Sequence, residues 1–176
     1  MNISPKTIEL INQDTNIHPL YGNRLANHFP MAAIALHKLG ATYERLLEFK
    51  EKYCTKLEEF NREALSNDFI FKENLGHSEK FAQYLSYFDC YLSSHSIEQT
   101  IETHIDKLVP GIGASAFHAL IRLAFAIESK NAQEVSIALA YWAAEYQFLG
   151  SPQVKSDKPI LEILNQHKEL FESFDF

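Results

Sequence analysis

The sequence predicts an all-α fold: one domain over residues 1–176, built as a multi-helical bundle of about six to eight helices. Three observations predict it. Apolar residues recur at helical spacing in several segments, Ser, Pro and Gly stand where those segments begin and end, and no segment shows the alternation of a strand. The 176 residues are 46% hydrophobic and 22% charged, which suits a globular domain with one core and is too apolar for a disordered chain.

The first helix is expected to begin at Ser4 and Pro5, because Ser is a favoured cap and Pro suits the first helical turn. It should end near Asp14. The stretch that follows, residues 16–29, contains one Pro, one Gly and three Asn. A loop or broken helix is therefore expected there rather than a strand.

Pro30 marks the start of the next helix, which should run to Leu39 and stop at Gly40. A further helix should begin at Thr42 and continue to about Phe60, because Leu, Phe and Tyr recur there at helical spacing among Lys and Glu. The charged face of this helix is expected to be solvated.

Two helices are expected in the middle of the chain. The first begins after Ser78 and carries an aromatic stripe to Leu92. The second opens with Ser96 and Gln99, which match the S-x-x-Q capping box. It must end before Pro110, which cannot easily continue a helix.

The most apolar segments come late in the chain. Residues 114–129 are apolar almost all round, which predicts a central helix packed on several sides. Residues 134–148 have a similar pattern and are followed by Gly150 and Pro152. A last helix is expected over residues 159–171.

Charge and hydropathy exclude several classes of protein. The net charge of −7 provides no basic field for phosphates, so nucleic acid is not an expected partner. The N-terminus has no signal-peptide pattern, and the apolar run 116–127 is too short to span a membrane. Cys54 and Cys90 lack metal-ligand spacing and suggest no disulfide framework. We expect a soluble, cytoplasmic protein.

Three polar residues lie at i, i+3 and i+7 in the apolar segment 114–129: Ser115, His118 and Arg122. On a helix they would share one stripe. His118 would exchange protons near neutral pH, and Arg122 would bind an anionic oxygen. The alternative is a structural ion pair beside a core histidine, since a buried guanidinium requires a partner. Glu145 is the first choice of partner.

His28 precedes the helix that starts at Pro30, where free backbone N–H groups favour an anion or a carbonyl oxygen. Asn27 would cap that helix. The alternative is that both side chains only satisfy the backbone of the turn.

Tyr141, Trp142 and Glu145 form an aromatic and acidic group on the segment 134–148. Aromatic residues at this spacing are more often core than a platform for a ligand. A role in substrate binding is the alternative, and Asn27 and Ser115 are candidates for the same role.

Motifs for a metal or a nucleotide are weak. The sequence contains no H-E-x-x-H, no E-x-x-H and no cysteine pair, so no metal site is expected. Gly111, Gly113 and Ala116 match G-x-G-x-x-A, but Pro110 and a helix precede them where a dinucleotide fold has a strand. A turn between helices explains these glycines.

Three ordered motifs resemble the questin oxidase-like family. They are LANHFPMAAIALHKLGA, LVPGIGASAFHALIRLAFAIE and ALAYWAAEY, spread between residues 25 and 146. The family has an Asn-His followed by Pro-Met-Ala-Ala, then a Pro-Gly turn followed by a His-x-x-Ile-Arg helix. Members are usually much longer than this chain. A natural short form, a fragment and a homodimer that completes its cleft therefore all stay open.

The resemblance implies an oxidoreductase, in particular a flavin-independent monooxygenase of the Baeyer–Villiger type acting on a cyclic or aromatic ketone. It implies NADPH as the cofactor and a small apolar or aromatic molecule as the partner. His28, His118 and Arg122 would then be the catalytic residues. The alternative function is a non-catalytic helical module that binds a small ligand or associates with itself.

Overall fold

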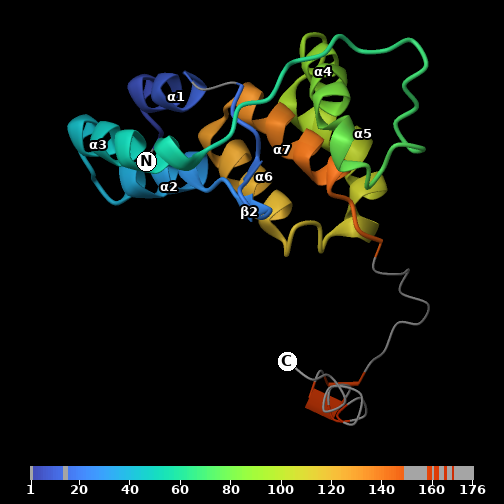
Figure 1. Cartoon of the computed structure of the whole chain (residues 1–176). Coiled ribbons are helices and arrows are strands. Elements are labelled where there is room, and N and C mark those ends of the chain that lie inside the picture. Colours follow the sequence, from blue (N-terminus) through green and yellow to red (C-terminus); the bar gives the residue numbers. More distant parts are fainter. Residues whose placement is uncertain are drawn as a thin grey trace.

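The computed structural model describes residues 2–13, 16–148, 158–159, 161–162, 165 and 168. This part of the chain contains seven α-helices and one short hairpin, which confirms the predicted all-helical fold (Figure 1). None of its helices is long and apolar enough to cross a membrane. Most of the helix expected over residues 159–171 lies outside the described residues. The helices are α1 (Pro5–Asn12), α2 (Phe29–Lys38), α3 (Tyr43–Tyr53), α4 (Phe81–Leu92), α5 (Ile97–Leu108), α6 (His118–Ser129) and α7 (Ala132–Ala144).

Local capping sets the ends of several helices as predicted. Ser4 and Thr42 each accept a hydrogen bond from a first-turn N–H of α1 and α3. The capping box of α5 is complete: Ser96 Oγ accepts the N–H of Gln99 at 3.2 Å, and Gln99 Oε1 accepts the N–H of Ser96 at 2.9 Å. Gly40 follows α2 with a φ of 89°, a left-handed conformation that glycine adopts without strain.

Residues 20–26 form a hairpin, although a loop or broken helix was expected there. Strand β1 (Leu20–Tyr21) pairs antiparallel with β2 (Leu25–Ala26). Each strand is only two residues long, too short for an alternating pattern to appear in the sequence. Arg24, at the turn, has a φ of 61°, which is uncommon for a residue with a side chain.

The helix expected from Thr42 to Phe60 ends early, at Tyr53, and the short helix η1 (Cys54–Lys56) follows it. Beyond η1 the chain is extended and runs beside residues 16–18. The N–H of His18 donates to the Glu58 carbonyl at 2.7 Å, and the N–H of Phe60 donates to the Asn16 carbonyl at 2.8 Å. These long-range bonds compete with continued helix and bring His18 next to the hairpin.

The central helix is α7, whereas residues 114–129 were expected at the centre. Every residue of α7 from Glu134 to Ala144 is buried, and α7 packs mainly against α4 and α6 (Figure 1). Helix α6 starts only at His118, because Ser115, Ala116 and Phe117 adopt φ values of 47°, 52° and 67°. One side of α6 remains exposed.

Two hydrophobic clusters form the core. Helices α1 to α3 surround the first, around Leu10, Ile34 and Leu46. Helices α4 to α7 surround the second. Helices α2 and α6 join the two clusters and run parallel: His28 meets His118 at their starts, and Lys38 forms an ion pair with Glu128 at their ends. Residues of the hairpin and of α2 thereby face residues of α6 and α7.

Candidate functional site

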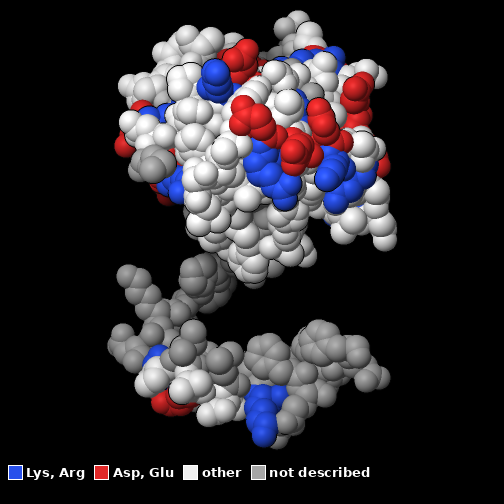
Figure 2. Space-filling model, turned by 90° about the vertical axis from the view of Figure 1, so that its left-hand side faces the viewer, with Lys and Arg blue, Asp and Glu red and all other residues white. Residues whose placement is uncertain are grey.

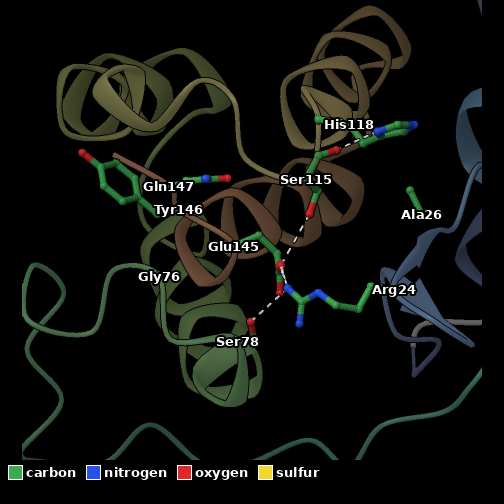
Figure 3. A pocket seen from close by; sticks show the side chains of 10 residues that line it. Arg24, Ala26, Gly76, Ser78, Ser115, His118, Glu145, Tyr146 and Gln147 are labelled. Atoms are coloured by element: carbon green, nitrogen blue, oxygen red, sulfur yellow. Dashed lines mark hydrogen bonds and ion pairs between the residues drawn. The ribbon is translucent and has the colours of Figure 1, made fainter. Parts of the chain in front are cut away.

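A cleft of about 530 Å³ lies where the hairpin faces the start of α6 and the end of α7. Polar side chains from four separate segments line it (Figure 3). They are Arg24 from the hairpin, Ser78 from η2 (Ser78–Lys80), Ser115 from the turn before α6, His118 from the start of α6, and Glu145 from the C-cap of α7. Convergence of polar groups from distant segments is the usual form of a small-molecule site.

His118 is oriented by the strained turn before α6. Its Nδ1 lies 2.7 Å from the Ser115 carbonyl oxygen. A carbonyl only accepts hydrogen bonds, so Nδ1 carries the proton and Nε2 is left to accept or donate one. No side chain caps α6; its first N–H, that of His118, donates to the same Ser115 carbonyl at 3.1 Å.

His28 stands next to His118, as the sequence motifs require if they form one site. The two ring centroids are 4.9 Å apart and the planes are nearly perpendicular, at 84°. The side chain of His28 is exposed, while its backbone N–H donates to the Tyr53 hydroxyl at 2.9 Å. Burial raises the pKa of Tyr53, so that hydroxyl stays protonated near neutral pH. The pair brings α2 and α6 together at the edge of the cleft.

Glu145 is paired with Arg24, and the prediction that it pairs with Arg122 is wrong. Glu145 Oε2 accepts from Nη2 of Arg24 and lies 3.5 Å from the Ser115 hydroxyl. The sequence carries no signal for this contact, because the partners are 121 positions apart and Arg24 stands in an irregular polar stretch. Arg24 is therefore a site residue that sequence reasoning missed.

Arg122 is part of a buried ion pair with Glu134. Nε and Nη2 of Arg122 donate to the two carboxylate oxygens at 3.0 and 3.1 Å, and the side chains are only 3% and 5% exposed. Arg122 does not line the cleft. The predicted stripe with Ser115 fails as well, because Ser115 precedes α6.

The remaining predicted residues lie behind the cleft or away from it. Asn27 is buried, and its Oδ1 accepts the N–H of Phe29 at 2.9 Å. The N-cap of α2 is His28, which makes no side-chain capping bond, so the prediction that Asn27 caps the helix is wrong. Trp142 is fully buried in α7, where its indole N–H donates to the Gly111 carbonyl at 3.0 Å. Tyr141 is also buried. Burial raises the pKa of its hydroxyl, and the Glu145 carboxylate raises it further.

A second cavity of about 290 Å³ adjoins the cleft and shares Arg24, Ser78 and Glu145 with it. His18 and Tyr21 also line this second cavity. Burial lowers the pKa of His18, so the ring is neutral at pH 7. Its Nδ1 accepts the N–H of Leu20 at 3.0 Å.

The described residues hold no cluster of three or more His, Cys, Asp or Glu side chains arranged for a metal ion. Gly111 lies in the short helix η3 (Val109–Gly111), after α5 and not after a strand. A Cβ on Gly111 would lie 2.4 Å from Cδ2 of Tyr146. The glycine thus allows close packing, and the G-x-G-x-x-A spacing marks a turn.

Comparison with known proteins gives one match. No curated protein and no solved structure matches the chain. A family model described as Questin oxidase-like matches residues 25–175. This range begins at β2, directly after Arg24, and contains both histidines of the pair and all of α7. The chain belongs to the questin oxidase-like family, which is an oxidoreductase-like assignment.

Proposed function

We propose that this chain is a monooxygenase of the Baeyer–Villiger type that acts on a cyclic or aromatic ketone without a flavin. The reaction inserts one oxygen atom of O₂ beside the carbonyl to give an ester or lactone. The other oxygen atom leaves as water, for which a reductant supplies two electrons and the solvent supplies two protons. The His28–His118 pair beside the cleft, in a chain of this family, is the observation that carries the proposal.

The two imidazoles provide a hydrogen-bond donor for the ketone oxygen and a group that can transfer a proton. A substrate carbonyl in the cleft at the edge of this ring pair would accept a hydrogen bond when a ring is protonated, and Nε2 of His118 would take up or return a proton. The negative charge that develops on oxygen would lie near the uncapped start of α6. Arg122 is paired inside the core, so the proposal gives it no contact with the substrate.

NADPH, the cofactor that the resemblance implies, does not fit the residues of the cleft. Its phosphates require several cationic side chains or a glycine-rich helix start. Arg24 is the only Lys or Arg among the residues that line the two cavities, and Glu58, Glu79 and Glu145 lie on the same walls. The proposal therefore assigns NADPH no place in the cleft and routes no step through it. We also propose that the protein is cytoplasmic, as the sequence suggests.

The test is oxygen consumption with a panel of ketones, including cyclohexanone and 1-tetralone, with ascorbate added in solution as the two-electron reductant and mass spectrometry of the products. We expect a lactone or ester with one added oxygen atom. Changing His118 to Ala should lower kcat about 10²- to 10⁴-fold, the usual range for a lost acid or base.

His95 provides a matched control for this experiment. It is an exposed histidine at the end of α4, stacked on Tyr91 and outside the cleft. His95→Ala should keep full activity. Turnover that His118→Ala leaves unchanged would disprove the role of the pair, even if the product is the expected one.

A second candidate function is a non-catalytic module that associates with itself, and the exposed side of α6 favours it. Leu39, the residue after α2, is 85% exposed, and Phe117, Ile121 and Ile127 on α6 or beside it are 42–50% exposed. We call these four residues the α2–α6 face. Lys38 and Glu128 neutralise each other there, so nothing in the face repels a second copy. Figure 2 shows charged side chains gathered over the upper part of the body and an uncharged lower part.

Sedimentation velocity tests this candidate. A homodimer is expected, and Ile121→Glu should weaken its association by at least about tenfold, because a carboxylate would be buried without a partner. Ile70→Glu serves as the control, since Ile70 is equally exposed and lies outside the α2–α6 face. A wild-type chain that sediments as a monomer at every concentration would exclude this candidate.

A further inference from the structure

The two cavities are separated by a single ion pair. The cleft beside His118 and the smaller cavity beside His18 have three wall residues in common, Arg24, Ser78 and Glu145. Figure 3 shows the guanidinium of Arg24 meeting the carboxylate of Glu145, with the Ser78 hydroxyl beside it. The position of the Arg24 side chain therefore decides whether a ligand can extend from the cleft into the smaller cavity.

The partners of this ion pair differ in exposure. The Arg24 side chain is 65% exposed, whereas that of Glu145 is 6% exposed. Only Nη2 of Arg24 donates to described residues, to Glu145 and to Ser78. Nε and Nη1 have no partner in that part of the chain, although a guanidinium has five donors that suit a carboxylate in pairs. The Arg24 end of the pair is solvated, so Nε and Nη1 can reach a second carboxylate at the mouth of the cleft.

Glu145 has other donors if Arg24 turns to a ligand. The Ser115 hydroxyl lies 3.5 Å from Glu145 Oε2. The Tyr141 hydroxyl is buried, has no hydrogen-bond partner among the described residues, and feels the charge of Glu145. These two hydroxyls would keep the carboxylate solvated by the protein.

We propose that Arg24 is a specificity-determining residue that binds the carboxylate of a small organic acid in competition with Glu145. The ring of that acid would lie in the cleft beside His118, and its carboxylate would lie at the boundary of the two cavities. The smaller cavity repels an anion from going deeper, since Glu58 and Glu79 line it. This inference rests on the proposed function for the part of the ligand that carries the ketone. The binding of its carboxylate depends only on Arg24.

The test uses two probes of nearly equal size, the anion 2-naphthoate and the neutral 2-naphthamide. Their binding to the full chain is measured by isothermal titration calorimetry. The wild type should bind 2-naphthoate more tightly than 2-naphthamide. Glu145→Gln removes the competitor, so it should tighten 2-naphthoate about tenfold and leave 2-naphthamide unchanged. Arg24→Gln should weaken 2-naphthoate about tenfold and abolish the preference.

Arg45→Gln is the matched control, because Arg45 is 66% exposed and forms an ion pair with Glu48 on α3. It should bind both probes like the wild type. Equal binding of the two probes by the wild type and by Glu145→Gln would overturn the inference. Binding is measured without turnover, so a preference for 2-naphthoate supports the inference even if no ketone is oxidised. Ketone turnover together with equal binding of the two probes would overturn it and leave the proposed function intact.

Discussion

Replacing Arg122 with Ala is expected to lower the free energy of unfolding by about 3–5 kcal/mol, the usual cost of removing one partner of a buried ion pair. Both partners are almost fully buried, and two hydrogen bonds of 3.0 and 3.1 Å join them. Without Arg122, the Glu134 carboxylate would stay in the core with no countercharge. Urea denaturation followed by circular dichroism measures the loss.

Two further variants separate charge from volume. Arg122→Met combined with Glu134→Leu removes both charges and keeps apolar bulk, so it should recover most of the stability. Arg45→Ala breaks an exposed ion pair and should cost less than about 1 kcal/mol. A loss below about 1 kcal/mol for Arg122→Ala would contradict the structural role and reopen a role in binding.

Replacing Trp142 with Ala is expected to cost about 3–5 kcal/mol of stability, because it leaves a large cavity in the core. Trp142 is fully buried in α7, the helix on which α4 and α6 pack. Its indole N–H also donates to the Gly111 carbonyl at 3.0 Å, and that bond is lost as well, although the carbonyl still accepts the N–H of Ala114.

The same denaturation experiment checks this prediction, with Trp142→Phe as the control. Phe keeps much of the ring volume and loses the N–H, so it should cost clearly less than Ala. The sequence left open whether Trp142 binds substrate. If Trp142→Ala keeps the wild-type stability and weakens only the binding of 2-naphthoate, Trp142 is a ligand contact and its structural role is wrong.

The parts of the fold that follow from local chemistry could be predicted from the sequence. Ser4, Thr42 and the Ser96–Gln99 box cap helices where expected, and Gly40 ends α2. Caps and terminators act within about one helical turn, so neighbouring residues suffice to recognise them. The early end of α3 at Tyr53 could not be foreseen, because long-range backbone bonds between residues 16–18 and 58–60 decide it.

For the candidate site, the sequence alone determined the all-helical class, the family motifs and His28 at a helix start, whereas it placed His118 inside a helix that in the structure begins at His118. Tertiary structure decided the partners of the two charged residues predicted for the site: Glu145 joins Arg24, and Arg122 joins Glu134. The left-handed turn at residues 115–117 places Ser115 before the start of α6. The sequence gives no sign of this turn, because none of the three residues is a glycine. Helix signals are local, whereas the partner of a buried charge depends on which distant helices pack together.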